Sequence, residues 1–186
     1  MFIIYYLVAI DMITGNWMEE QEKRENFENF AQELVSTAGG DIAQIPNAGS
    51  MLTKLKCTWY SISFDNNSVT IEGALFDNSQ AIIQALIAPH LEFKDKIMLD
   101  NQTGTVLTAM QKFMNISITA EIKGTTLYRY GTALGEELPE VMIEMAVNED
   151  NPNELIEKCI YNPKQIEAKC YFTKVEVKPN DYAWCS

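Results

Sequence analysis

The chain has 186 residues, of which 47% are apolar and 22% are charged, so it can bury a core and does not have the composition of a disordered protein. Its 14 basic and 26 acidic side chains give a formal net charge of −12. Proteins bind nucleic acids and anionic membranes mainly through Lys and Arg, so this charge argues against direct binding to either. We expect a single compact domain over residues 1–186.

The N-terminal segment is apolar. Residues 2–10 are too few to span a bilayer, and no basic stretch precedes them as in a signal peptide. We therefore expect a buried central strand there. The four cysteines, which do not have the spacing of a CxxC pair or a zinc site, are expected to be reduced thiols. Together these features predict a cytoplasmic protein.

A long helix is expected to follow this strand. Asn16 and Glu19 have the spacing of an N-cap residue and its N3 carboxylate, so the helix should begin at Asn16. An apolar stripe with helical spacing follows, and it comprises Phe27, Phe30, Ala31, Leu34 and Val35. The glycines at 39–40 should end the helix.

Alternation of apolar and polar residues predicts several strands in the rest of the chain. The expected strands are residues 58–64 and 69–71, which form a hairpin, 116–122 and 125–130, which form another, 141–147 and 167–177. Apolar residues at helical spacing predict further helices. These are expected between about Asn78 and Pro89, from about Thr105, and after a loop at 148–153.

Consecutive hairpins with interspersed helices are typical of an α+β protein. The sequence thus predicts an α+β fold, a mostly antiparallel sheet of about six to eight strands with about three helices packed on it.

Catalytic signatures are missing from the sequence. The single histidine, His90, has no evident catalytic partners, and neither GxxxxGK[ST] nor GxGxxG occurs. We identify no catalytic residue, metal site or cofactor, and the sequence favours a protein that is not an enzyme.

An acidic block is the most distinctive feature. Between Arg129 and Lys158 the chain has 28 residues and no basic side chain. The eight carboxylates of this block are Glu136, Glu137, Glu140, Glu144, Glu149, Asp150, Glu154 and Glu157. Carboxylates at such density can imitate a phosphate backbone and occupy a basic groove. Ordinary solubility is the competing explanation.

The leading hypothesis is therefore an acidic, non-enzymatic inhibitor that occupies the basic groove of a nucleic-acid-binding protein, as anti-defence proteins of phages and mobile elements do. Tyr128 and Tyr130 could supply aromatic anchors. The predicted partner-binding residues are Glu136, Glu137, Glu140, Glu144, Glu149, Asp150, Tyr128 and Tyr130.

Two alternatives remain open at this point. The chain could be an α+β enzyme or small-ligand-binding domain whose site is built from scattered residues. It could also be a structural subunit of a homo-oligomer, since the sequence does not determine the oligomeric state.

Overall fold

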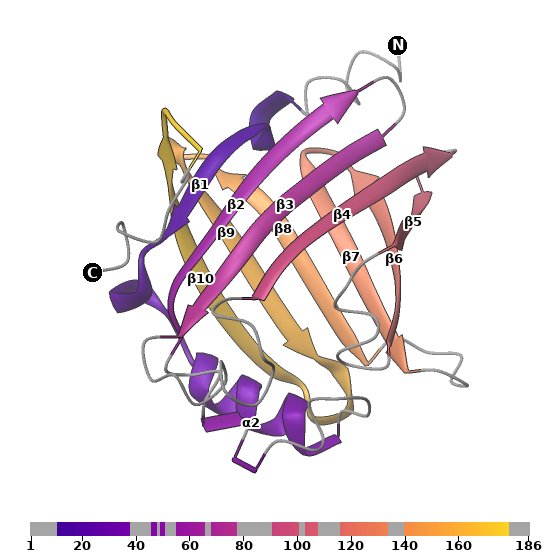
Figure 1. The fold of residues 1–186 in the computed structure, drawn as a ribbon. Coiled ribbons are helices and arrows are strands. Elements are labelled where there is room, and N and C mark those ends of the chain that lie inside the picture. The colour runs from indigo at the N-terminus through magenta and orange to yellow at the C-terminus, as the bar shows by residue number, and fades with distance from the viewer. Residues whose placement is uncertain are drawn as a thin grey trace.

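The structure is a computed structural model that describes residues 11–37, 46–47, 49–50, 55–65, 68–77, 91–100, 103–107, 116–133 and 140–178. The described strands form one closed antiparallel barrel (Figure 1). They are β1 (Gly15–Glu19), β2 (Leu55–Asp65), β3 (Ser68–Asp77), β4 (Leu91–Asp100), β5 (Thr103–Leu107), β6 (Ile116–Lys123), β7 (Thr126–Ala133), β8 (Val141–Asn148), β9 (Asn151–Tyr161) and β10 (Ile166–Val175).

Each strand from β2 to β10 pairs with its neighbours in sequence, and β1 closes the barrel. Trp17 of β1 lies opposite Lys174 of β10 on one side and opposite Tyr60 of β2 on the other. Because every described strand has two hydrogen-bonded neighbours, the barrel has no open sheet edge. Gly124, with φ of 61°, occupies the tight turn between β6 and β7.

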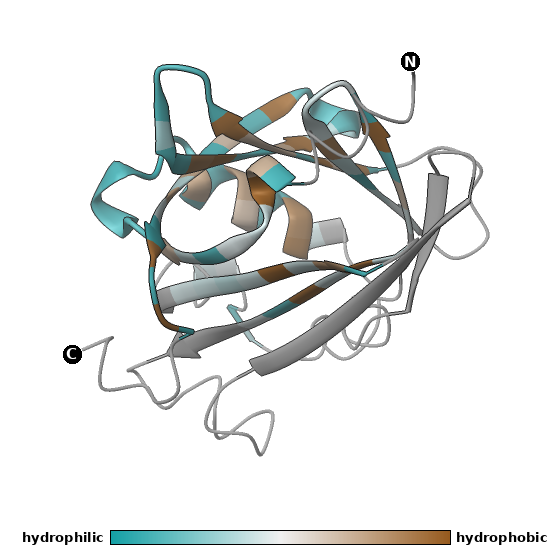
Figure 2. Ribbon diagram, turned by 90° about the horizontal axis from the view of Figure 1, so that it is seen from above, coloured by the Kyte–Doolittle hydropathy of each residue, from teal (hydrophilic) through white to brown (hydrophobic). Residues whose placement is uncertain are grey.

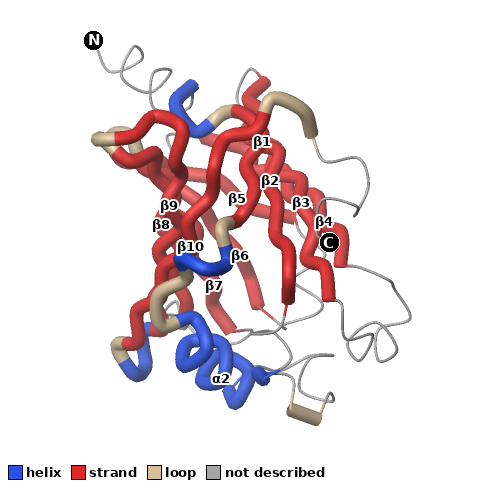
Figure 3. The backbone as a smooth tube through the Cα atoms, turned by 90° about the vertical axis from the view of Figure 1, so that its left-hand side faces the viewer, coloured by secondary structure: helices blue, strands red, loops and turns tan. Residues whose placement is uncertain are grey.

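The helical elements within the described residues are short. They include α2 (Phe27–Thr37) and the 3-10 turns η1 (Gln21–Lys23) and η3 (Asn162–Lys164), and residues 11–13 and 49–50 are also helical. Helix α2 lies across one end of the barrel and contacts β9 and β10, as two perpendicular views show (Figures 1 and 3). Phe30 of α2 packs with Tyr161 and Ala168, so the apolar face of α2 closes over the end of these strands.

Hydrophilic and hydrophobic residues alternate along strands of the barrel wall (Figure 2). Burial alternates in the same way along β9. In β9, Leu155 is fully buried and its neighbour Ile156 is only partly buried. The main core contains buried residues of β1, β2, β3, β6, β7, β8, β9 and β10, among them Trp17, Ile71 and Leu127. These side chains therefore point into the barrel, and the alternate residues face outward.

The predicted α+β fold is wrong. The strands are antiparallel as expected, but they curl into a closed barrel and do not form a sheet covered on one side by about three helices. Right-handed twist and continuous hairpin pairing bring β10 to β1, and this long-range pairing has no signal in a local pattern. Whether residues 1–186 form one domain stays a prediction.

Three predictions of local structure are also wrong, and in each case a strand forms where another structure was expected. Residues 15–19 form β1 instead of the first helical turns, because Trp17 is buried between two partner strands. Residues 151–161 form β9, where a loop and a short helix were expected. Residues 103–107 form β5, where the third helix was expected to begin.

Other predictions of local structure are confirmed. The apolar stripe of α2, both hairpins and strands β8 and β10 form where the patterns place them. The predictions for residues 2–10, for the helix between Asn78 and Pro89 and for His90 lie outside the described residues.

Within the part of the chain that the structure describes, no helix has both the length and the apolar character needed to cross a membrane.

The alternation in β9 can be tested with a pair of substitutions. We expect Leu155→Ala to lower the free energy of unfolding by about 2–5 kcal/mol, because it leaves a cavity inside the barrel. Ile156→Ala on the outer face should cost markedly less. Urea denaturation of both variants measures the difference, and equal losses would contradict the inward orientation of Leu155.

Candidate functional site

The barrel encloses a group of polar and charged side chains, which we call the inner polar cluster. Its members come from four strands and from the segment that leads into α2. They are Glu19 of β1, Arg24, Tyr60 of β2, Arg129 of β7 and Glu157 of β9. The side chains of Glu19 and Glu157 are 2% and 8% exposed, so two carboxyl groups are buried. Burying a charged group costs free energy, so this part of the interior is a candidate functional site.

Arg24 and Glu19 form a bidentate pair. The Nε and Nη2 atoms of Arg24 donate hydrogen bonds to the two carboxylate oxygens of Glu19, each at 2.6 Å. The guanidinium carbon also lies 4.6 Å from the centre of the Phe27 ring, at the start of α2. This pair therefore connects the first strand to the helix that covers the barrel end.

Glu157 is the centre of the second half of the cluster. The Tyr60 hydroxyl donates a hydrogen bond to Oε2 of Glu157 at 2.9 Å. Nη2 of Arg129 lies 3.9 Å from the same oxygen, within ion-pair range. The Cys159 thiol donates to Oε1 at 3.8 Å. Three strands far apart in sequence thus direct polar groups at one carboxyl group.

Burial dominates the electrostatics of this carboxyl group. It raises the pKa of Glu157 above its ordinary value, although the charge of Arg129 and the hydrogen bond from Tyr60 oppose the shift. Burial, followed by the charge of Glu157, raises the pKa of the Tyr60 hydroxyl well above its usual range. Tyr60 is therefore a neutral hydrogen-bond donor at physiological pH.

Cys159 and Cys170 also lie inside the barrel, and both are free thiols. Burial, with the nearby Glu157 carboxyl as the next cause, raises the pKa of Cys159 well above its ordinary value. Burial likewise raises the pKa of Cys170. Because the thiolate is the reactive form, neither cysteine has the character of a nucleophile. Among the described residues, no group of His, Cys, Asp or Glu side chains could hold a metal ion.

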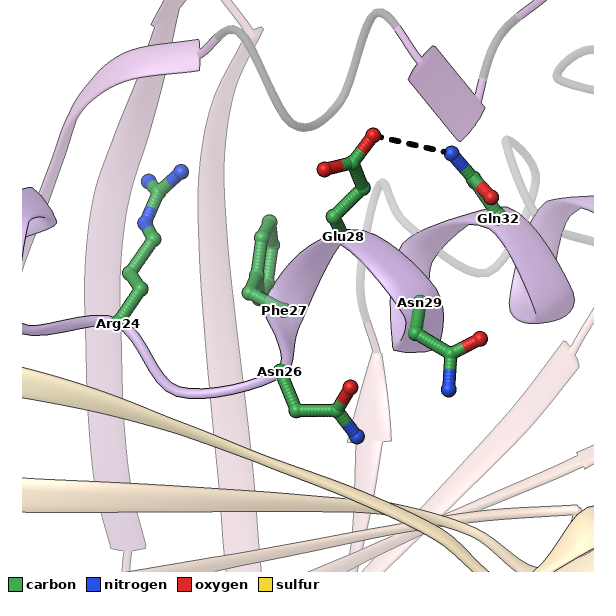
Figure 4. Close-up of a pocket in the computed structure, with 6 residues that line it drawn as sticks. All are labelled: Arg24, Asn26, Phe27, Glu28, Asn29 and Gln32. Carbon is green, nitrogen blue, oxygen red and sulfur yellow. Dashed lines mark hydrogen bonds between the residues drawn. The ribbon is translucent and has the colours of Figure 1, made fainter.

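A pocket of about 650 Å³ lies at the start of α2 (Figure 4). It is lined by Arg24, Asn26, Phe27, Glu28, Asn29 and Gln32. Gln32 donates a hydrogen bond to Glu28 at 3.2 Å, one turn away along the helix. Arg24 belongs both to this pocket and to the inner polar cluster, so the pocket and the interior meet at one guanidinium group.

Apolar side chains surround the inner polar cluster. Tyr60 packs on Phe172 with ring centroids 4.9 Å apart, and Met145 and Leu127 are buried in the same core. An eight-stranded barrel is just wide enough to be filled by side chains or to hold one small ligand, and the diameter grows with strand number. The barrel formed by the described residues has ten strands.

The predicted partner-binding residues do not gather at this cluster. Glu136 and Glu137 lie outside the described residues. Of the others, Glu149 and Asp150 are exposed at the turn between β8 and β9, and Glu140 precedes β8. Glu144 on β8 lies opposite Lys158 on the outer face, and Tyr128 and Tyr130 stack with ring centroids 6.3 Å apart. No finding tests these residues as a binding surface.

The acidic block is divided by the alternation of the strands. Glu157 points into the barrel, whereas Glu154 accepts hydrogen bonds from Lys23 and Asn148 near the rim. A block that is continuous in sequence is therefore not one continuous acidic face.

Sequence reasoning missed the members of the inner polar cluster. Arg129 has the same phase as the buried Leu127, and Glu157 has the same phase as the buried Leu155. The available signal in the sequence was a charged residue two positions from a buried one along a strand, which indicates a charged side chain that points inward. It could not show that Tyr60 and Glu157, 97 positions apart, form a hydrogen bond.

Comparisons of sequence identify no relative, since neither a family model nor a curated protein matches the chain. Comparisons of structure do find similar folds. Caenorhabditis elegans lipid binding protein 8 in its apo form matches with a TM-score of 0.59 and 12% identity, over 89% of this chain and 96% of that one.

Two further solved structures have the same fold. A mutant of the REP1-NXSQ fatty acid transporter matches with a TM-score of 0.56 and 15% identity, over 88% of this chain and 98% of its own. The Schistosoma mansoni fatty acid binding protein, in complex with arachidonic acid, matches with a TM-score of 0.55 and 9% identity, over 90% and 99% of the two chains. At these identities the likeness establishes the fold alone.

These findings correct the hypothesis of an anti-defence inhibitor that mimics nucleic acid. The fold is the barrel of the proteins just named, whose names refer to lipids and fatty acids. The predicted partner, a basic nucleic-acid-binding protein, has no support from this fold. The alternative of a small-ligand-binding domain with a site of scattered residues agrees better with the findings.

The raised pKa of Glu157 gives a pH test. The folded protein binds the Glu157 proton more tightly than the unfolded protein does. The contribution of this proton to the free energy of unfolding is therefore complete below pH 4.5, and it is lost as pH rises through the pKa of the folded state. Urea denaturation measures the difference in the free energy of unfolding between wild type and Glu157→Gln. We expect this difference, wild type minus variant, to decrease as pH rises over this range.

Glu25 on the outer surface provides the control. The hydrogen bond from Tyr171, followed by burial that opposes it, leaves the pKa of Glu25 lowered. The difference between wild type and Glu25→Gln should therefore change in the opposite sense and fall as pH drops. The same slope for both variants would contradict the assignment of Glu157 as a buried carboxyl group.

Proposed function

We propose that this protein binds a small, largely apolar molecule inside the barrel, with the polar end of the ligand at the inner polar cluster. The observation that carries the proposal is a buried Glu157 that accepts a hydrogen bond from Tyr60 and lies within ion-pair range of Arg129, among apolar side chains in a closed barrel. Ligand sites combine these features, an apolar lining with a few polar groups that fix orientation.

The energetics of buried polar groups support this reading. Removing two charges from water costs several kcal/mol per ion, and their attraction often does no more than offset that cost. A fully apolar interior would therefore be as stable or more stable. The inner polar cluster is better explained by recognition than by stability, because Arg129 and Glu157 are buried inside the barrel in spite of this cost.

The similar folds support the same proposal. Their names state that one is a lipid binding protein, one a fatty acid transporter and one a fatty acid binding protein with arachidonic acid bound. We infer that this chain uses the shared barrel for a ligand of related character, with polar contacts of its own. A cytoplasmic location, the absence of enzymatic activity and the independence from cofactors remain predictions.

The binding test uses Nile red, an uncharged dye that fluoresces in apolar surroundings. We expect wild-type protein to bind the dye at one site and to release it on addition of long-chain lipids. Tyr60→Phe should weaken lipid binding by about tenfold, since it removes one donor from the inner polar cluster. Titrations followed by fluorescence measure both effects.

Tyr171→Phe is the matched control. Its hydroxyl donates to Glu25 at 2.5 Å on the outer surface, so its loss should leave lipid affinity unchanged. If Nile red does not bind, or if lipids do not compete with it, the proposed function is wrong. Equal weakening by both Tyr variants would exclude the inner polar cluster as the ligand site.

A further inference from the structure

We propose that the polar end of the ligand is uncharged and both donates and accepts a hydrogen bond, as the hydroxyl of a long-chain alcohol does. This inference rests on the proposed function and names the class of ligand for the same site. It implies that the interior discriminates against a fatty-acid carboxylate, even though proteins with this fold include fatty-acid binders.

The positive and negative charges of the inner polar cluster balance each other. The inner polar cluster contains two guanidinium groups, Arg24 and Arg129, and two carboxyl groups, Glu19 and Glu157. Each carboxyl group is paired with one of the arginines, so the cluster already compensates its own charge. An additional carboxylate would enter an apolar interior without a cation of its own, which is costly.

Each arginine already faces a buried acid. Glu19 binds Arg24 through both oxygens at 2.6 Å and is 2% exposed. Glu157 is 8% exposed and is held by Tyr60 as well as by Arg129. A ligand carboxylate that displaced either acid would leave it buried and close to the new charge, where like charges repel.

The hydrogen-bonding groups at Glu157 also favour a ligand hydroxyl over a ligand carboxylate. Oε1 of Glu157 accepts from the Cys159 thiol at 3.8 Å, and a thiol is a weak donor. A hydroxyl group could donate to this oxygen more strongly, and it could accept from Arg129, whose Nη2 lies 3.9 Å from the other oxygen, Oε2. A carboxylate has no hydrogen to donate, so it offers Glu157 nothing in exchange.

Binding of a carboxylate should therefore require a proton. The charged and titratable groups that face Glu157 are Arg129 on β7, Tyr60 on β2, Glu19 on β1, Cys159 on β9 and Cys170 on β10, and Arg24 before α2 pairs with Glu19. Burial raises the pKa of Glu157, which makes this residue the proton acceptor of the cluster. Affinity for a fatty acid should rise as pH falls, whereas affinity for the alcohol should not rise with it.

The experiment compares tetradecanol with tetradecanoate, which have equal chain length, by displacement of Nile red near pH 8. For wild type we expect the alcohol to bind at least about tenfold more tightly. In Glu157→Gln the cluster carries one net positive charge, so the affinity for tetradecanoate should increase by about tenfold. Glu167→Gln makes the same charge change outside the barrel, next to Lys158, and should not alter the preference.

A preference for the alcohol in wild type is not sufficient evidence, because an alcohol partitions more readily than a carboxylate into any apolar site. The change in tetradecanoate affinity caused by Glu157→Gln is therefore the decisive result. Should this variant not fold, calorimetry on wild type in buffers of different ionisation enthalpy measures proton uptake with tetradecanoate. Uptake of a proton supports the inference. Tetradecanoate binding as tightly as the alcohol in wild type, with no proton uptake, overturns it. Binding of neither compound would instead show that the proposed function itself is wrong.

Discussion

The pairing of β1 with both β10 and β2 is the constraint on which the rest of the structure depends. It joins the two ends of the described strand order, so no strand edge is left open and an inside is separated from an outside. Trp17 and Glu19 enter the barrel as a direct result, because they occupy the inward phase of this short strand. The helix that covers one end depends on the same strand, since Arg24 binds Glu19 and contacts Phe27 at the start of α2.

Closure also determines the chemistry of the interior. Inside the barrel the dielectric constant is low, so Glu157 cannot be treated like the carboxylates that precede it in the chain. It is held by groups from β2 and β7, and burial raises its pKa. We therefore propose that recognition depends on the polar end of the ligand, because the inner polar cluster is small and its members contact one another.

The sequence reveals local structure here better than long-range structure. The stripe from Phe27 to Val35 identifies α2, and alternation identifies both hairpins, because these signals are set by neighbouring residues. β1 was mistaken for a helix start because Asn16 and Glu19 resemble a cap when its partner strands are unknown. The inner polar cluster could be suspected from charges in buried phases, but its assembly requires contacts between residues 97 positions apart. In the sequence Glu157 is one carboxylate of the acidic block, whereas in the structure the strand turns it inward.

The most direct test of the account is to locate a ligand within the barrel. A long-chain alcohol carrying a nitroxide group at its apolar end would be added to protein with labelled methyl groups, and paramagnetic broadening would be measured by NMR. The account predicts strong broadening of the inward methyl groups of Met145 and Leu155, and weak broadening of the outward Ile156 and Ile160. Equal broadening of both sets, or broadening confined to the outward set, would contradict binding inside the barrel.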